Sequence, residues 1–414
     1  MNTLFISYNG AMEPLVKSQG TPYIEGLGQK DIGCVMLTFE KSFPDTNTFK
    51  NALERMRAEL NKKNIEWFHL KYHKKPTVPA TLLDILTGTI VSIYIVLSRS
   101  IHIIHCRATV AGLMGFIAAR LTGRKLLFDA RGLMAEEYVD GGIWKKSSLL
   151  YHCTAMFEKH LLKKADAVVV LSENIRQFLL TSNYLYSNSQ KKRQITVIPC
   201  CVDVKKFNRF SILDTSLREK NHLEGKFVFL YSGSLGTWYL LEEMCDFFAA
   251  AKTVIPNAYF LILTHSPAES VIRCWSEKKL DPADFAVKNC AFENMPEMLT
   301  LADAGIFFIK PSLSKRASCP IKFAEFLAAG IPVVINAGIG DTDTIVKTHK
   351  VGVVVEAFNT ETYLEAAREI ETMSKEKTVV KNKCFHIAQS FFSVDIGVSR
   401  YFDLYKNITQ APIR

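Results

Sequence analysis

Short apolar runs alternate with longer stretches of helical character along the whole chain. The apolar runs are residues 4–8, 33–39, 102–106, 125–128, 167–171 and 195–199, followed by 227–231, 259–263, 304–309, 331–335 and 351–355. Runs such as 167–171 are apolar on both faces, which is typical of strands in a parallel sheet that helices cover on both sides. The pattern therefore predicts an α/β protein with two doubly wound Rossmann-like domains in tandem.

The pattern restarts in the middle of the chain, which predicts a domain boundary there. We expect an N-terminal domain over residues 1–205 and a C-terminal domain over 206–388, with a hinge in the polar stretch 203–224. Residues 389–414 begin with an amphipathic, aromatic-rich segment, which predicts a closing helix that crosses back to the N-terminal domain. Open α/β sheets bind ligands beyond the carboxyl ends of their strands, so we expect the site in a cleft between the domains.

Composition and charge narrow the class of protein. The chain has 414 residues, 48% of them apolar and 22% charged, as in ordinary globular proteins, and its net charge of +10 favours anionic partners. It contains no nucleic-acid-binding motif, so phosphorylated ligands or an anionic membrane are the preferred partners. The ten cysteines show no CxxC spacing, and the N-terminus lacks the pattern of a signal peptide. Both features predict a cytoplasmic protein with free thiols.

One apolar segment resembles a membrane span. Residues 82–97 are mostly apolar, but the segment has only 16 residues, includes Asp84, and is shorter than the ~20 residues that cross a bilayer. We expect a buried helix. A helix lying on a membrane surface is the alternative, because basic residues stand just before the segment: Lys71, His73, Lys74 and Lys75.

Two segments of the second half carry candidate chemistry. Ser234 and Gly236 lie in a small-residue turn between a strand and a helix, where backbone N–H groups could approach an anion, although such turns also serve packing alone. In the segment 318–334, Lys322 and Glu325 lie three residues apart at the start of a predicted helix. A lysine suits phosphate and a carboxylate can accept both hydroxyls of a ribose, whereas the alternative is a surface ion pair.

The segment 318–334, SCPIKFAEFLAAGIPVV, resembles the carboxyl-terminal signature of retaining GT-B glycosyltransferases of the large sucrose-synthase-like family, family 4. It is most similar to bacterial members with the string SxPxKxxE(Y/F)LAxGxPVV. The segments 128–132 (FDARG), 165–173 (ADAVVVLSE), 198–203 (IPCCVD) and 231–238 (YSGSLGTW) also resemble this family. These matches extend over most of the chain in the expected order, and the resemblance implies the GT-B fold.

The resemblance assigns the C-terminal domain to the sugar donor. Glu325 matches the second glutamate of the family's EX7E element, which holds the nucleotide ribose, whereas Ala317 stands where the first glutamate would be. The donor sugar is then expected to contact Ser318 or the backbone of Cys319 to Ile321. The Arg and Lys that usually follow Gly236 and bind the pyrophosphate are missing, so Lys322 is the predicted replacement, with Lys315 and Arg316 as alternatives.

The resemblance assigns the N-terminal domain to the acceptor. A His usually lies near the reacting sugar where this chain has the segment 129–131, so Asp129 or Arg131 is expected there as a catalytic residue. Gln19 and Gly20, in the first loop, are expected to contact phosphate or the acceptor, with a plain turn as the alternative.

The implied activity is retaining transfer of a sugar from a nucleotide diphospho-sugar to an acceptor hydroxyl. The resemblance suggests a glycan or lipid-linked acceptor in cell-surface polysaccharide or lipopolysaccharide synthesis, on the inner face of the cell membrane. Lys322 would stabilise the leaving diphosphate. The leaving phosphate would help to deprotonate the acceptor, so no dedicated base is required. The alternatives are a sugar-nucleotide epimerase and a basic, non-enzymatic binder of membrane or nucleic acid.

No metal or other cofactor is expected. The string Asp341-Thr342-Asp343 is of the DxD type that binds a divalent ion in the other large transferase fold, but its place after a strand favours a loop or helix-cap role. His102 and His105 are expected on opposite faces of one strand, which argues against a metal site.

Overall fold

The computed structural model describes residues 1–41, 46–182, 184–185, 194–208 and 215–410. The chain divides into two compact units, Met1–Pro199 with Val394–Arg414, and Cys200–Ser393. We call them the N-terminal and the C-terminal unit. The division falls at 199/200, six residues before the predicted boundary.

The N-terminal unit is built on a parallel sheet of seven strands with the order β3-β2-β1-β4-β5-β6-β7. The strands are β1 (Asn2–Ser7), β2 (Gly33–Glu40), β3 (Ile65–Lys71), β4 (Ile103–Arg107), β5 (Lys125–Asp129), β6 (Ala167–Val170) and β7 (Ile195–Val197). The chain builds outward from β1 to β3 and then continues on the other side of β1. The switch of direction therefore lies between β1 and β4, where doubly wound sheets bind their ligands.

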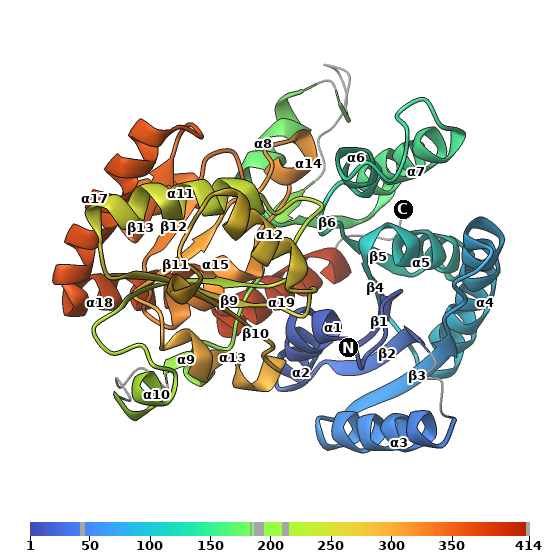
Figure 1. Ribbon diagram of the computed structural model, residues 1–414. Coiled ribbons are helices and arrows are strands. Elements are labelled where there is room, and N and C mark those ends of the chain that lie inside the picture. Colours follow the sequence, from blue (N-terminus) through green and yellow to red (C-terminus); the bar gives the residue numbers. More distant parts are fainter. Residues whose placement is uncertain (42–45, 183, 186–193, 209–214, 411–414) are drawn as a thin grey trace. The chain divides into compact units, whose positions relative to one another are not determined.

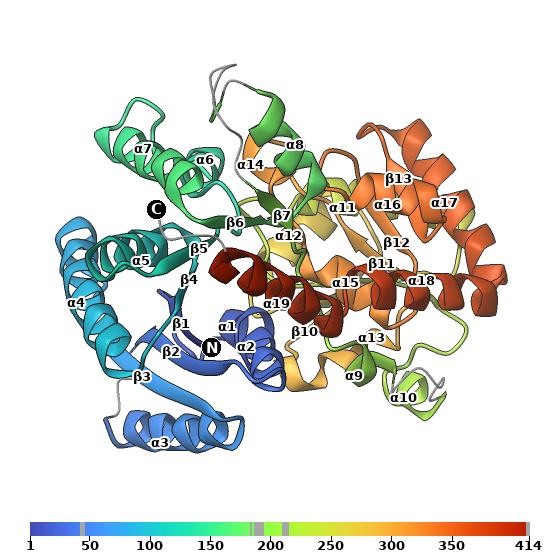
Figure 2. The ribbon, with the colours of Figure 1, turned by 180° about the vertical axis from the view of Figure 1, so that it is seen from behind.

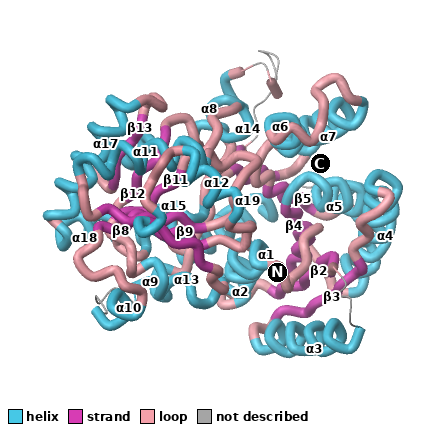
Figure 3. Tube along the Cα trace, viewed as in Figure 1, coloured by secondary structure: helices cyan, strands magenta, loops and turns pink. Residues whose placement is uncertain are grey.

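Helices enclose this sheet, as Figure 3 shows for the strands in magenta and the helices in cyan. They are α1 (Pro14–Gln19), α2 (Thr21–Gly28), α3 (Thr46–Lys62), α4 (Thr77–Ser98), α5 (Ala108–Thr122), α6 (Met134–Asp140), α7 (Leu149–Lys164), α8 (Glu173–Thr181) and α19 (Val394–Gln410). The last helix, α19, packs against α2, as Figure 2 shows (α19 dark red, α2 blue). Gly26 permits this contact, since a Cβ there would lie only 2.4 Å from Val398.

The C-terminal unit repeats the plan with a parallel sheet of the order β10-β9-β8-β11-β12-β13 (Figure 1). Its strands are β8 (Phe227–Ser232), β9 (Ala258–Leu263), β10 (Phe285–Lys288), β11 (Ala304–Phe307), β12 (Val333–Asn336) and β13 (Gly352–Val355). Its α-helices are α9 (Val204–Asn208), α10 (Thr215–Lys220), α11 (Leu241–Val254), α12 (Glu269–Glu277), α13 (Met295–Leu299), α14 (Leu313–Arg316), α15 (Ile321–Ala328), α16 (Thr342–His349), α17 (Thr360–Lys375) and α18 (Lys377–Phe391). Here the direction switches between β8 and β11.

The two doubly wound sheets confirm the predicted fold class. All six residues of β8 are buried, as expected for a strand with helices on both sides. Two strands were not predicted, β3 and β10. Neither has a continuous apolar run, because both are edge strands whose residues are partly exposed.

The structure corrects two details of the predicted elements. The closing segment is not one helix from residue 389, since α18 ends at Phe391 and α19 begins at Val394. Between them Phe392 accepts a 2.7 Å hydrogen bond from the Val202 amide, which interrupts the helix. The buried helix predicted over residues 82–97 is longer, 77–98, and its outer face is exposed. Within the described residues, α4 is the one helix long and apolar enough to cross a membrane by length and composition.

Candidate functional site

The predicted helix at the signature segment is α15. Pro320 precedes its first residue, and Gly330, with a left-handed φ of 77°, follows its end. Proline is favoured at helix starts and glycine just past helix ends, so the sequence determines both boundaries. Lys322 and Glu325 lie on the first turns of α15, and both are buried, at 5% and 8% exposure.

The Lys322 ammonium lies among aromatic rings at the carboxyl ends of β8 and β11. Its Nζ is 4.1 Å from the ring centre of Tyr231, 3.7 Å from that of Tyr239 and 5.9 Å from that of Phe307. We call these four residues the lysine box. Within the described part of the chain, Nζ has no hydrogen-bond partner. Ring faces attract a cation, but a buried ammonium also needs acceptors, so the lysine box is suited to receive an anionic group.

Burial shifts the pKa of both ionisable groups on α15 toward neutrality. Loss of water lowers the pKa of Lys322 to about 7, and Glu325 only partly offsets the effect. Loss of water also raises the pKa of Glu325 to about 7, with Lys322 acting in the opposite direction. Small changes in the surroundings, such as an arriving anion, therefore change the charge of this site near neutral pH.

The predicted glycine turn lies directly beside the lysine box. Gly233 has φ 124°, and a Cβ at this position would lie 2.9 Å from Lys322 Nζ. Gly236 has φ 83°, and the Tyr231 hydroxyl donates to the Ser234 carbonyl. Ser234 and Gly236 are exposed, so the backbone of this turn is accessible next to a buried cation.

The other residues predicted to bind the sugar donor lie just before α15 or at its first position. Ser318, Cys319 and Ile321 are partly buried, and Cys319 Sγ accepts a 3.4 Å hydrogen bond from the Cys200 amide. Of the two alternatives to Lys322, Lys315 is buried with Nζ 4.1 Å from the ring centre of Trp238, and Arg316 is exposed.

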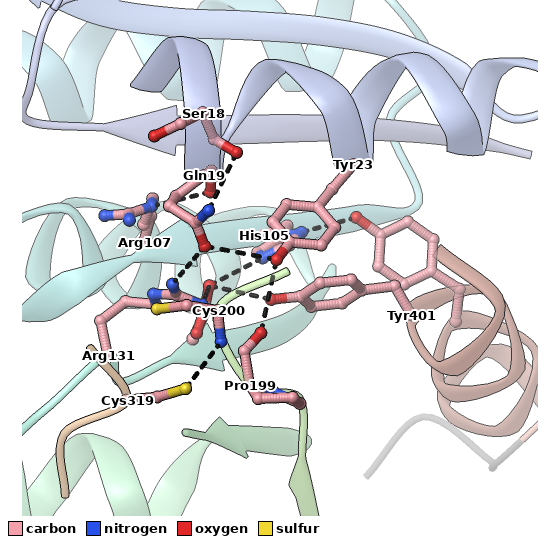
Figure 4. A network of polar contacts seen from close by, with 12 residues as sticks. Ser18, Gln19, Tyr23, His105, Arg107, Arg131, Pro199, Cys200, Cys319 and Tyr401 are labelled. Carbon is pink, nitrogen blue, oxygen red and sulfur yellow. Dashed lines mark hydrogen bonds and ion pairs between the residues drawn. The ribbon is translucent and has the colours of Figure 1, made fainter. Parts of the chain in front are cut away.

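In the N-terminal unit, Asp129 is the last residue of β5, and both Asp129 and Arg131 belong to a buried polar network. Figure 4 shows Arg131 beside Gln19 in this network. Asp129 is 2% exposed and accepts a 3.0 Å hydrogen bond from the Tyr401 hydroxyl on α19. Arg131 Nη1 is 3.7 Å from Asp129 Oδ2, and Arg131 Nη2 donates to Gln19 Oε1 at 3.2 Å. Asp129 and Arg131, the two residues of this unit predicted to be catalytic, therefore form an ion pair with each other.

His105 belongs to the same network. Its Nδ1 lies 2.8 Å from the Tyr405 hydroxyl, and its Nε2 lies 3.9 Å from Asp129 Oδ2. Burial lowers the pKa of His105. Burial alone would raise the pKa of Asp129, but Arg131, His105 and Arg107 together hold it below its usual value. Asp129 is therefore an anion that keeps the Arg131 guanidinium in place.

The loop residues predicted to contact a ligand are in this network as well. Gln19 is the last residue of α1 and is 2% exposed, and its backbone carbonyl accepts a 3.2 Å hydrogen bond from Arg107 Nε. Arg107 ends β4, and in the register of the sheet it stands opposite Ser7 of β1 and Asp129 of β5. Gly20 lies tightly against Val16, since a Cβ would be 3.0 Å from its side chain and carbonyl. These residues meet at the switch point between β1 and β4.

Two weaker sequence signals have structural roles. Asp343 lies in the first turn of α16 and accepts a 2.9 Å hydrogen bond from the Gly338 amide in the preceding loop, which agrees with the loop role expected for the DxD string. His102 is exposed before β4 whereas His105 is buried within it. Among the residues that the structure describes, no group of three His, Cys, Asp or Glu side chains could hold a metal ion.

Sequence reasoning missed several members of these sites. Tyr401 and Tyr405 come from the far end of the chain, where only the aromatic-rich pattern marked them. Tyr231 and Tyr239 flank the glycine turn, in the YSGSLGTWY string, and were not recognised as partners of a lysine 83–91 residues later.

The chain matches two family models. Residues 52–201 match the model described as glycosyl transferase 4-like domain, and residues 214–384 match that of glycosyl transferases group 1. The first range lies in the N-terminal unit apart from two residues, and the second lies in the C-terminal unit. No protein of curated function matches the chain significantly.

Solved structures share the fold over almost the entire chain. A glycosyltransferase from Rickettsia africae is 16% identical with a TM-score of 0.73, and the match covers 99% of each chain. A sucrose-phosphate synthase from Thermosynechococcus elongatus is 15% identical with a TM-score of 0.71, covering 99% of this chain and 100% of that one. Anabaena HepE in complex with UDP-glucose is 13% identical with a TM-score of 0.68, covering 98% and 99%. These matches and the two family models support a glycosyltransferase with the GT-B fold.

Proposed function

We propose that this chain is a retaining glycosyltransferase that moves a sugar from a nucleotide diphospho-sugar to a hydroxyl of a glycan or lipid-linked acceptor. The observation that carries the proposal is the lysine box, a buried cation with aromatic neighbours and no hydrogen-bond acceptor among the described residues. A diphosphate would supply the missing acceptors. The similar Anabaena structure is a complex with UDP-glucose, which supports a donor of this class.

In the proposed donor complex Lys322 binds the diphosphate together with the N–H groups at the start of α15. A helix N-terminus carries partial positive charge and free N–H donors, which adds to the charge of the lysine. The exposed backbone at Ser234 and Gly236 offers further N–H groups beside it. During transfer negative charge accumulates on the departing diphosphate, so these groups stabilise the transition state as well as the bound donor.

Glu325 is proposed to hold the ribose. Its ionised carboxylate has two oxygens, which can accept one hydrogen bond from each of the two ribose hydroxyls. Two such donors favour the charged form, so binding would lower the pKa of Glu325 from its value of about 7 in the unliganded protein. With Ala317 in place of the first glutamate of the family's element, Ser318 and the backbone of Cys319 to Ile321 are proposed to contact the donor sugar.

In the N-terminal unit Arg131 is proposed to contact a substrate. Asp129 is proposed to position the Arg131 side chain. The Arg131 guanidinium lies between Asp129 and Gln19, and its contacts with these two side chains hold it in one direction. We propose that the leaving phosphate itself accepts the proton of the acceptor hydroxyl, so that the reaction proceeds without a metal ion. We also propose a cytoplasmic location, on the inner face of the cell membrane.

Isothermal titration with UDP, GDP and ADP tests the proposal. We expect one of these to bind, and Glu325→Ala to weaken binding by about 10- to 100-fold, as for loss of hydrogen bonds to a charged group. Glu369→Ala is the matched control, since Glu369 is an exposed glutamate of α17 in the same unit, and it should bind as the wild type does. Failure of the wild type to bind any of the three nucleotides would overturn the proposal.

The reaction type needs a second measurement. The enzyme with a sugar nucleotide and an acceptor should give a glycoside with the anomeric configuration of the donor, which proton NMR of the product reports. Incubation with the donor alone should leave the sugar configuration unchanged. An epimerised donor sugar would identify a sugar-nucleotide epimerase instead.

A further inference from the structure

The outer face of α4 is apolar along its whole length. The helix has 22 residues, and its exposed large side chains are all apolar or aromatic. They are Val78, Leu82, Leu83, Leu86, Ile90, Tyr94 and Leu97, with exposures between 47% and 69%. At 100° per residue these positions fall within one continuous face, which we call the α4 face.

The inner face of the same helix carries its one charged residue, Asp84. The other buried residues are both polar and apolar: Ala80, Gly88, Thr89, Ser92, Ile95 and Val96. A surface helix of a soluble protein usually has charged residues on its outer face. The absence of charged residues from the outer face of α4 indicates that the medium facing the α4 face is apolar.

The inner face also ties α4 firmly to the N-terminal unit. Asp84 accepts hydrogen bonds from the Tyr8 hydroxyl at 2.8 Å and from the His73 amide at 3.1 Å. A Cβ at Gly88 would lie 2.6 Å from Met114 and 2.8 Å from Phe39, so α4 lies close to α5 and β2. These contacts would be lost if α4 crossed a bilayer by itself. A helix that lies flat on a membrane surface keeps them.

The exposed charged residues in the segments before and after α4 are mostly basic. The segment 71–128 contains eight Lys or Arg residues and a single acidic residue, Asp84, which is buried. Six of the basic residues are exposed: Lys71, Lys74, Lys75, Arg99, Arg120 and Arg124. Arg99 also pairs with Glu66 of β3. The basic side chains precede the helix, follow it, and lie on α5, which packs beside it and exposes Leu121.

We infer that the α4 face is the surface by which this protein lies on an anionic lipid bilayer. An apolar face flanked by lysines and arginines fits a membrane interface. There the apolar side chains contact the acyl region and the basic side chains contact the anionic headgroups. The His73–Asp84 contact of 2.5 Å holds the basic segment before α4 at the start of the α4 face. This surface would bring the enzyme to lipid-linked acceptors, a role that rests on the proposed function. Membrane binding itself does not, because it requires no nucleotide.

Sedimentation with vesicles tests the inference. We expect the full chain to bind mixed phosphatidylcholine–phosphatidylglycerol vesicles more tightly than vesicles of phosphatidylcholine alone, with the difference removed by high salt. Leu86→Glu combined with Ile90→Glu should lower binding to the mixed vesicles by about tenfold or more, because two charges enter the apolar contact. Lys74→Glu with Lys75→Glu should remove the preference for the anionic lipid.

Ile272→Glu combined with Val379→Glu is the matched control, since both residues are exposed apolar side chains, at 51% each, of the C-terminal unit. This variant should bind vesicles as the wild type does. All variants should titrate with nucleotide as the wild type does, so a failure of vesicle binding is distinguishable from a failure of the proposed transferase. Absence of wild-type binding to either vesicle overturns the inference. So does a dimer in sedimentation velocity that Leu86→Glu with Ile90→Glu abolishes while vesicle binding persists.

Discussion

The Tyr401 hydroxyl donates a 3.0 Å hydrogen bond to Asp129, and so joins the last helix of the chain to the carboxyl end of β5. Both residues are buried, and Asp129 also faces Arg131 at 3.7 Å. Burial raises the pKa of the Tyr401 hydroxyl, which therefore remains a donor at all physiological pH values. The polar site of the N-terminal unit is thus incomplete without residues 394–410.

Tyr401→Phe should destabilise the N-terminal unit and disturb Arg131. The substitution removes a hydrogen-bond donor from a buried carboxylate, which costs about 1.5–3 kcal/mol in the free energy of unfolding. Urea denaturation followed by circular dichroism measures this change. Tyr94→Phe is the control, because Tyr94 is 59% exposed on α4 and should leave the free energy of unfolding unchanged. Equal stability of Tyr401→Phe and wild type would contradict the role of this hydrogen bond.

Gly233→Ala should weaken nucleotide binding. An added Cβ would lie 2.9 Å from Lys322 Nζ, and the backbone there has a left-handed φ of 124°. The lysine must then move within the lysine box, and we expect binding of the nucleotide to weaken by about tenfold, an energy of about 1.4 kcal/mol. Titration calorimetry measures it.

Gly225→Ala is the matched control for that change. Gly225 also has a left-handed φ, of 67°, but nothing lies within 4 Å of an added Cβ. Its substitution introduces backbone strain without contacting a lysine. If both alanine variants lose nucleotide affinity equally, strain in the unit and not contact with Lys322 explains the effect.

The central strands and the signature helix could be predicted from sequence because their determinants are local. Pro320 and Gly330 mark the two ends of α15, and the apolar residues of β8 mark a strand buried on both faces. The edge strand β3 was missed because a partly exposed strand has no continuous apolar run. Trp67 on β3 is buried and donates a 2.8 Å hydrogen bond to Thr38, so only part of this strand faces outward.

The partners of the site residues could not be predicted, because they depend on packing between distant segments. Lys322 was recognised from its motif, yet the rings around it are 83 to 91 residues away in sequence. The orientation of α4 could not be predicted from the sequence either. Its apolar composition was evident, but which residues face inward depends on Gly88 packing against Met114. The basic run Lys191-Lys192-Arg193, whose charge predicts a solvated face, lies outside the described residues.

Glu158 should make the stability of the N-terminal unit depend on pH. It is buried on α7 and accepts hydrogen bonds from the amides of Met134 and Ala135, at 2.6 and 3.1 Å. Burial raises its pKa to about 7, above the value of 4.5 for an exposed glutamate. The folded state therefore binds more protons than the unfolded state between these values. The stability that protonated Glu158 contributes is complete below pH 4.5 and is lost as the pH rises through about 7.

Comparison with Glu158→Gln isolates this effect. As the pH rises from 4.5 to 7, the wild type should lose stability relative to Glu158→Gln. The loss in its free energy of unfolding should be up to about 3 kcal/mol. Urea denaturation at each pH measures it. Glu54→Gln, an exposed change on α3, should give a difference that does not vary with pH. A constant difference for Glu158→Gln would show that its pKa is not raised in the folded protein.

Nucleotide binding should take up a proton at Lys322. Burial lowers the pKa of Lys322 to about 7, so at pH 8 most of the unliganded protein has a neutral amine. A bound diphosphate favours the ammonium and raises this pKa, and affinity should fall as the pH rises above 7, by up to about tenfold per unit. Glu325, with a pKa of about 7, is mostly ionised in the same range and adds little to this change.

Calorimetry at pH 8 in HEPES and in Tris buffer measures the proton directly, because the two buffers differ in ionisation enthalpy and neither is a phosphate that competes for the site. The observed binding enthalpy should differ between the buffers for the wild type. Lys322→Met keeps a side chain of similar length without the amine, so its binding should be weaker and should no longer take up a proton at pH 8. If the wild type shows no difference between buffers while still binding, Lys322 is already charged without ligand. The rings of Tyr231 and Tyr239 would then be sufficient to hold the buried ammonium, and the anion would be recognised by backbone N–H groups alone.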